Sequence, residues 1–197
     1  MSVSLSDDER NFEMARIQPV QPEQASDAAR KLLDAVKRQL GLVPNIFKTL
    51  AQSPAVLDAY LKQMSALASG DLDPKLREQI ALVAAGKNQC DYCASAHTLL
   101  GKGAGVAESE LANNLKAQST DTTTQAALSF AAAIVDQRGR VADSELAAVR
   151  QAGFSDGQIV EIIAVTCMNI FTNYFNHIAD TEVDFPLVST FSLSQAV

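Results

Sequence analysis

The chain has 197 residues, of which 47% are hydrophobic and 20% are charged, and it carries a net charge of −7 with a pI near 4.8. This length fits one medium-sized domain, and the composition is that of an ordinary globular protein. The acidic charge, with no basic stripe, argues against binding to nucleic acid or to an anionic membrane surface. We predict a single domain over 1–197, with a flexible segment at 1–16, a helical body at 17–182 and a C-terminal arm at 183–197.

The N-terminal segment MSVSLSDDERNFEMARIQPV is polar and acidic, and it lacks the apolar stretch of a secretory signal. No run of 18 uncharged apolar residues occurs; the nearest, 159–175, contains Glu161, Asn169 and Asn173. We therefore expect a cytoplasmic protein without a membrane partner. In a reducing compartment a Cys-x-x-Cys pair is more often catalytic or metal-binding than a structural disulfide.

Helical periodicity runs through most of the sequence. Apolar residues recur at helical spacing from Pro22 to Leu40, and Gly41 ends this stripe. Further helices are expected at 46–51, 55–68, 75–85, 91–102, 108–116, 122–137, 143–151 and 157–180, separated by turn residues. Because the alternating pattern of strands is absent, we predict an all-α fold.

The last residues, VDFPLVSTFSLSQAV, lose the helical period and predict an arm. The arm is apolar for a chain ending, and an apolar arm normally docks on another surface. That surface belongs either to the same chain or to a neighbouring subunit. The apolar residues of the arm are Phe185, Pro186, Leu187, Val188 and Phe191.

Two predicted helices show a possible internal repeat, since Gln79-Ile80 and Gln158-Ile159 begin similar apolar segments 79 residues apart. Both an ancestral duplication and a chance alignment explain this likeness. In this register three residues of the first segment stand opposite three of the second: Cys90, Cys93 and His97 opposite Asn169, Thr172 and Asn176.

The segment NQCDYCASAH (88–97) carries the motif Cys90-x-x-Cys93-x-x-x-His97. At about 100° per residue these three side chains fall within an arc of about 60° on one helix face. The cysteines lie at the helix start, where unpaired N–H groups and the helix dipole favour a thiolate. Such a pair has lowered pKa values and can close a disulfide.

Glu78 precedes this motif by twelve positions. On one continuous helix it would lie about 18 Å from Cys90. A turn predicted at 86–89 changes this, because an antiparallel hairpin would bring Glu78 opposite His97. A carboxylate and an imidazole beside two thiols form a workable proton relay.

Glu78, eleven intervening residues and Cys90-x-x-Cys93-x-x-x-His97 together resemble the signature of the alkylhydroperoxidase D-like, carboxymuconolactone decarboxylase superfamily. The segments LGLVPNIFKTLAQSPAVLDAY (40–60) and NYFNHIADTEVDFP (173–186) resemble its peroxidase-related members, and the likeness covers residues 17–186. The resemblance implies a compact multi-helix AhpD-like fold and a homo-oligomer, commonly a trimer or hexamer. It also implies a thiol peroxidase that uses no metal, haem or other cofactor.

The resemblance also implies the residue roles: Cys93 as the peroxidatic cysteine, Cys90 as the resolving cysteine, and Glu78 with His97 as the proton relay. The implied partners are a hydroperoxide substrate and an external dithiol reductant, either a lipoyl protein or a thioredoxin-like protein. Tyr92 departs from the pattern, since characterised peroxidases often carry a second histidine there. A phenol with a pKa near 10 cannot shuttle protons at neutral pH as an imidazole does.

Other interpretations of these residues remain open. The cysteines could be buried small hydrophobes, or zinc ligands with His97 and Glu78. The function could be that of a thiol redox sensor or disulfide-exchange protein with little turnover, or of a cofactorless lyase in which Glu78 and His97 act on a carbon acid.

Several residues outside the motif are expected to be structural. Cys167, in an apolar run, is expected to be a core residue. His177 is expected to make a dipole or capping contact near a helix end. Phe171, Tyr174 and Phe175 are expected in the core or in an interface.

Overall fold

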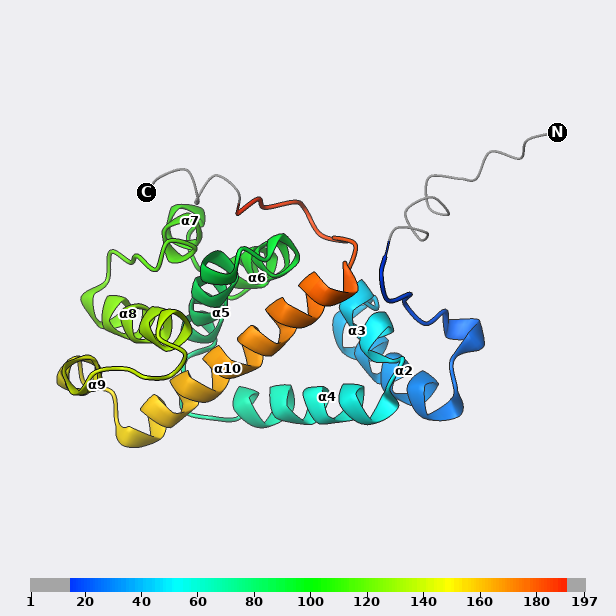
Figure 1. Cartoon of the computed structure of the whole chain (residues 1–197), viewed down its shortest axis with the longest axis horizontal. Helices are drawn as coiled ribbons and strands as arrows, with labels where there is room; N and C mark the ends of the chain where they lie inside the picture. Colours follow the sequence, from blue (N-terminus) through cyan, green and yellow to red (C-terminus); the bar gives the residue numbers. More distant parts are fainter. Residues whose placement is uncertain (1–14, 191–197) are drawn as a thin grey trace. The chain divides into compact units, whose positions relative to one another are not determined.

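The structure, a computed structural model, describes residues 15–190, and all of its regular elements are helices (Figure 1). They are η1 (Pro22–Gln24), α2 (Asp27–Leu40), α3 (Asn45–Leu50), α4 (Pro54–Ala68), α5 (Pro74–Asn88), α6 (Asp91–Gly103), α7 (Glu108–Asn114), α8 (Thr122–Asp136), α9 (Asp143–Gln151) and α10 (Asp156–Ala179). Residues 15–190 contain no strand, so the all-α prediction is confirmed. Nearly all of the segment predicted to be flexible, and Phe191 of the arm, lie outside the described residues.

Two helix boundaries differ from the prediction in an informative way. The stripe at 22–40 is divided, because the Ser26 hydroxyl accepts the N–H of Ala29 and begins α2 as an N-cap. The helix predicted at 75–85 continues through Gly86 to Asn88. The turn is Gln89 alone, in the left-handed conformation at φ 56°, and Cys90 is already the N-cap of α6.

The chain divides into two compact units, so the single-domain organisation stays a prediction. In the described residues, the first unit comprises 15–66 with 175–184. The N–H groups of Arg16 and Ile17 both donate to the carbonyl of Ala179, and the N–H of Asn45 donates to the Asp184 carboxylate at 2.8 Å. Apolar side chains of α2, α3 and α4 form its buried interior: Ala29, Leu33, Val36, Ile46, Phe47, Leu50 and Leu57.

The second unit comprises residues 67–174 and the arm from residue 185. Its core is built from α5, α8 and α10, with Val149 of α9. The Glu161 carboxylate of α10 accepts the N–H groups of Asp71 and Leu72, each at 3.0 Å, and so holds the loop that leads into α5. The largest apolar side chains of this core are Leu72, Leu76, Ile80, Leu128, Phe130, Ile134, Phe154 and Ile162.

Helix α5 passes very close to the end of α7. A Cβ atom added to Gly86 would lie 1.9 Å from the carbonyl oxygen of Leu115, far inside the contact distance of two atoms. Gly86 is therefore not a turn residue, as the sequence suggested, but a helical residue without a side chain where a backbone must approach. The approach positions α5, which leads directly into the cysteine pair.

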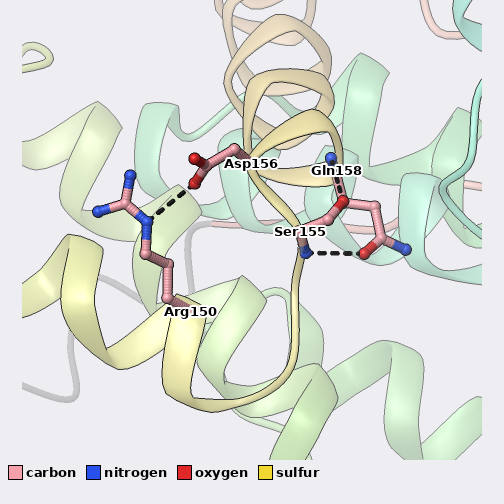
Figure 2. Close-up of polar contacts among 4 residues, drawn as sticks. All are labelled: Arg150, Ser155, Asp156 and Gln158. Carbon is pink, nitrogen blue, oxygen red and sulfur yellow. Dashed lines mark hydrogen bonds and ion pairs between the residues drawn. The ribbon is translucent and has the colours of Figure 1, made fainter.

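The start of α10 is stabilised by local polar contacts (Figure 2). The Ser155 hydroxyl accepts the N–H of Gln158 at 3.2 Å, and the Gln158 side-chain oxygen accepts the N–H of Ser155 at 3.1 Å. This reciprocal pair is a capping box. Arg150 of α9 donates to Asp156 at 2.9 Å, which ties the two helices together across their short connection.

The part of α10 within the second unit buries several polar residues and exposes several apolar ones. Asn169, Thr172 and Asn173 are buried, whereas Val160 is 63% exposed and Tyr174 is 53% exposed. The prediction that Cys167 is a core residue is wrong, because Cys167 is exposed on the apolar outer face. Periodicity could not indicate this, since α10 is apolar on almost every side.

The exposed aromatic residues follow from the same orientation of α10. Phe171 and Tyr174 are exposed, and Phe175 is half-buried, so the first two are not core residues. His177 lies in the last turn of α10, as expected. No single described helix is long and apolar enough to cross a membrane; only α9 and α10 taken together, bent by 118°, meet that test by length and composition.

Candidate functional site

The two cysteines of the motif lie at the N-terminal end of α6. Cys90 is the N-cap and its sulfur accepts the N–H of Cys93 at 3.4 Å, while the two sulfurs are 2.8 Å apart. This separation exceeds the roughly 2.05 Å of a disulfide bond, and both residues are free cysteines. Cys90 is 1% exposed and Cys93 is 3% exposed, so the thiols are close enough to join but sealed from solvent.

Glu78 of α5 and His97 of α6 meet beside this pair. Glu78 Oε2 lies 2.8 Å from His97 Nδ1, and both side chains are about one-fifth exposed, at 23% and 20%. The contact joins residues that are 19 positions apart, so the chain reverses between α5 and α6 as the predicted turn requires. The structure thus brings together all four residues predicted for the site, although a strictly antiparallel hairpin and their roles remain predictions.

The surroundings of His97 change its affinity for protons. Burial alone would lower the pKa of His97, because it disfavours the charged imidazolium. The Glu78 carboxylate opposes this effect through its charge and its hydrogen bond, and Cys93 and Asn169 act in the same direction. Together they raise the pKa of His97 above its ordinary value of 6.5. His97 therefore holds its proton to a higher pH than a free histidine does.

Asn169 of α10 is a site residue that the sequence interpretation did not identify as one. Its side chain lies near enough to His97 to help raise the pKa of the imidazole. The Asn169 amide nitrogen donates to the carbonyl of Val165 at 2.9 Å, so it is the amide oxygen that can accept a hydrogen bond from a donor outside its own helix. One signal in the sequence was available: in the possible internal repeat, asparagines of an apolar helix align with the residues of the cysteine motif.

A second asparagine contact joins the same elements. The Asn88 side chain, two positions before Cys90, donates to the side-chain oxygen of Asn173 at 2.8 Å. The polar inner face of α10 therefore contacts both the end of α5 and the imidazole on α6. This explains why α10 buries amides at a place where an apolar helix would be expected to bury leucine or valine.

The C-terminal arm docks on α6 of its own chain. The Asp91 carboxylate accepts the N–H of Thr190 at 2.7 Å and its hydroxyl at 2.6 Å, and the Ser95 hydroxyl accepts the N–H of Val188 at 2.9 Å. By helical geometry Asp91 and Ser95 lie on a side of α6 turned away from Cys93 and His97. The arm therefore clamps the cysteine helix without covering the thiols.

Tyr92 belongs to this clamp. Its ring contacts that of Phe185 edge to face, with centroids 5.5 Å apart and planes at 83°. Tyr92 is 4% exposed. This geometry gives Tyr92 a packing role in the place where the resemblance led us to look for a second histidine.

A zinc site would require several ligand side chains to lie close together. Within residues 15–190, no three histidine, cysteine, aspartate or glutamate side chains are grouped so that they could hold a metal ion. The four residues of the site form a thiol pair and a separate acid–imidazole pair. An acid–imidazole pair beside two thiols is an arrangement that can transfer protons.

Comparison with known families and structures agrees with the fold and the motif. Residues 54–137 match the carboxymuconolactone decarboxylase family. The crystal structure of an alkylhydroperoxidase AhpD core, a peroxidase-related protein from Ralstonia eutropha JMP134, is 25% identical with a TM-score of 0.78, and the match covers 87% of this chain and 93% of that one. A peroxidase-related protein from Silicibacter sp. TM1040 is 23% identical with a TM-score of 0.74, over 85% and 89% of the two chains.

A third similar structure is the debrominase Bmp8, a cysteine-to-alanine variant in complex with 2,3,4-tribromopyrrole. It is 18% identical with a TM-score of 0.74, over 86% of this chain and 91% of that one, a likeness that shows the fold alone. A search among curated proteins produced no match. The family match over residues 54–137 and the structural neighbours confirm the resemblance seen in the motif: the chain is similar to the carboxymuconolactone decarboxylase family and to AhpD-like, peroxidase-related proteins.

Proposed function

We propose that the protein is a thiol-dependent peroxidase that reduces hydroperoxides through a Cys90–Cys93 dithiol/disulfide cycle. The observation that carries the proposal is the pair of buried sulfurs 2.8 Å apart at a helix N-terminus, next to a hydrogen-bonded Glu78–His97 pair. The family match over residues 54–137 and the likeness to a peroxidase-related protein support it. We place the cycle in the cytoplasm, where the pair can be kept reduced.

In the first half of the cycle the Cys93 thiolate attacks the distal oxygen of the hydroperoxide. The S–O bond forms as the O–O bond breaks, so Cys93 becomes a sulfenic acid and an alkoxide leaves. The imidazolium of His97 supplies the proton that converts the alkoxide to an alcohol. This proton is the one that the Cys93 thiol transfers to His97 when the thiolate forms, and the Glu78 carboxylate stabilises the imidazolium that carries it.

In the second half Cys90 attacks the sulfur of the Cys93 sulfenic acid. The disulfide forms, and hydroxide leaves and is protonated to water. Two electrons have then passed from the thiols to the peroxide. An external dithiol, from a lipoyl or thioredoxin-like protein, returns them by thiol–disulfide exchange.

The exposure of the four side chains supports the division of roles. The thiols are sealed, whereas Glu78 and His97 each keep about one-fifth of their side chain in contact with solvent. The acid–imidazole pair therefore forms the boundary between the buried sulfurs and water. Position 92 holds a tyrosine, which packs against Phe185, so the proposed relay has one imidazole, that of His97. We therefore expect slower turnover than in relatives with two histidines.

Mass spectrometry of the Cys167→Ser variant tests the cycle. This background removes the exposed third thiol, which could form disulfides between molecules. One equivalent of hydroperoxide should produce a Cys90–Cys93 disulfide, with the loss of two hydrogens. In Cys90→Ser the reaction should stop at a sulfenic acid on Cys93, and in Cys93→Ser no cysteine should be oxidised. Oxidation at Cys90 in the last variant, or no disulfide in the first, contradicts the proposal.

The burial of both thiols favours one alternative, a redox sensor whose disulfide is reduced too slowly for turnover. A bulky protein reductant must reach sulfurs that are at most 3% exposed. Steady-state assays with lipoyl and thioredoxin-like dithiols separate the two functions. Rapid oxidation with no turnover on either reductant would identify the sensor.

A further inference from the structure

Asn173, on the buried side of α10, carries a hydrogen-bond donor that the described part of the chain does not use. Its side-chain oxygen accepts from the Asn88 amide at 2.8 Å, whereas its amide nitrogen, Nδ2, is buried without a partner among residues 15–190. The residue is 0% exposed, so bulk water does not reach this nitrogen. Leaving a buried amide N–H unpaired costs free energy, and such groups are rare in folded proteins. Asn173 therefore points to an acceptor that comes from outside the chain.

Two contacts fix the level of Asn173 along α6. Asn169 and Asn173 are four residues apart on α10, which places them on one face and about 6 Å apart along the helix axis. Cys93 and His97 have the same spacing on α6. Asn169 lies near His97, whereas Asn173 contacts Asn88, the last residue of α5, just before α6 begins. One turn back from His97 along α6 therefore corresponds to one turn forward along α10, and Asn173 comes to the level of Cys93.

The surroundings of this nitrogen indicate the kind of group that it would bind. Cys90 and Cys93 are 1% and 3% exposed, so a hydroperoxide that reaches the thiols leaves behind the water that hydrated its oxygens. Burying those oxygens is costly unless the protein supplies donors in place of water. An amide nitrogen can only donate, and a peroxide oxygen can accept. In the proposed cycle His97 serves the leaving oxygen, and the oxygen next to Cys93 still needs a donor.

We propose that Asn173 is a substrate-binding residue whose Nδ2–H donates a hydrogen bond to the hydroperoxide oxygen that Cys93 attacks. The inference rests on the proposed peroxidase function and adds to it the group that holds the substrate in line. The amide transfers no proton: the S–O bond forms as the O–O bond breaks, and the leaving alkoxide takes its proton from His97. The attacked oxygen stays on Cys93 as the sulfenic acid. A reagent that reacts through carbon gains nothing from this hydrogen bond.

A comparison of two reagents for the same thiol tests the proposal. In the full-length double variant Cys90→Ser, Cys167→Ser, Cys93 is the only one of the three cysteines that remains. Hydrogen peroxide oxidises the Cys93 thiolate, whereas iodomethane alkylates the same thiolate and has no oxygen to accept a hydrogen bond. Mass spectrometry measures both rate constants. The ratio of oxidation to alkylation cancels any change in the fraction of thiolate, because both reactions depend on it equally.

Two substitutions at Asn173 in this background should change the ratio. Asn173→Leu removes the donor and should lower the ratio of oxidation to alkylation about tenfold or more. Asn173→Asp keeps the shape of the side chain and an oxygen to accept from Asn88 but has no amide donor, so it should lower the ratio too. This second variant keeps the test open if the leucine variant folds poorly. Asn113→Leu, at a half-buried asparagine of α7, is the matched control and should leave the ratio unchanged.

The outcomes separate this inference from the proposed function. An unchanged ratio in both Asn173 variants overturns the inference, even if both rates fall, because Asn173 would then act on the thiolate or on the fold. The peroxidase cycle would survive that result. If hydrogen peroxide does not oxidise Cys93 in the double variant although iodomethane alkylates it, the proposed function fails, and the inference fails with it.

Discussion

Glu78 and Gln79 are consecutive residues of α5 with opposite surroundings. Glu78 has a partner, since its carboxylate meets His97 at 2.8 Å beside the thiols. Gln79 is only 6% exposed, yet within the described residues it makes no such contact and lies beside Leu72, Leu76 and Phe154 of the core. The difference teaches that neighbouring residues of one helix can belong to a polar site or to the packed core, because they face different parts of the unit.

Glu78 and Gln79 keep their different surroundings only if α5 stays in place. The largest expected effect therefore comes from a substitution that displaces this helix. Gly86→Ala places a methyl group against the Leu115 carbonyl, and we expect a loss of about 3 kcal/mol in the free energy of unfolding. Urea denaturation measures it. The thiol reactivity should weaken as well, since Glu78 lies on α5 and Cys90 follows directly after this helix.

Gly103→Ala, at the end of α6, is the control for this substitution. No atom lies within 4 Å of the added Cβ. We expect it to be neutral or stabilising by up to about 1 kcal/mol. If the two alanine variants unfold at the same urea concentration, the close approach of α5 and α7 does not position the helix.

Glu78→Gln tests the residue of α5 that belongs to the proposed relay. We expect peroxidase turnover to fall about 100-fold, because the variant keeps the shape of the side chain but removes a proton-transfer group. Glu108→Gln, which removes an exposed carboxylate paired with Lys102, is the matched control and should leave turnover intact. Full turnover in Glu78→Gln would remove Glu78 from the relay.

A smaller effect is expected at the clamp on α6. Thr190→Val removes the hydroxyl that donates to Asp91 at 2.6 Å and should cost about 1 kcal/mol. Hydrogen exchange of the amides at 188–190 should become faster. The isosteric control is Thr98→Val on α6, since the Thr98 hydroxyl is buried without a partner among the described residues, and its loss should be nearly neutral. Equal effects of the two variants would mean that Asp91 does not hold the arm.

The smallest effect concerns pH. Because the pKa of His97 is raised in the folded state, the folded chain binds the imidazole proton more tightly than the unfolded chain does. The resulting stabilisation of the folded state is fully present below the pKa of His97 in the unfolded chain, near 6.5. It is lost as the pH rises through the higher pKa of His97 in the folded chain. The stability difference between the unmodified chain and His97→Gln should therefore narrow as the pH rises from 5.5 to 9. A difference that widens over this interval contradicts the raised pKa.

The thiol site could be predicted from the sequence because its geometry is local. Cys90, Cys93 and His97 share one helix face by periodicity, and a single reversal of the chain suffices to bring in Glu78. The same reasoning found the all-helical fold, since caps and apolar stripes are properties of neighbouring residues. Local patterns thus predicted the elements and the four residues that carry the proposed chemistry.

The contacts between distant elements could not be predicted in this way. Asn169 reaches His97 from a helix more than 70 positions away, and nothing in an almost uniformly apolar stretch tells which face turns inward. Gly86 looked like a turn residue because only the Leu115 carbonyl, far along the chain, explains it.

The inverted polarity of α10 has a consequence for how tolerant this helix is to mutation. A comprehensive substitution scan should find that Asn169 and Asn173 resist replacement by leucine, although leucine is the better match to the hydropathy of their neighbours. Val160 and Cys167, on the outer face, should accept serine or lysine in a chain that functions alone. If these outer positions instead reject polar residues, the scan will have mapped a surface that the functional assembly covers.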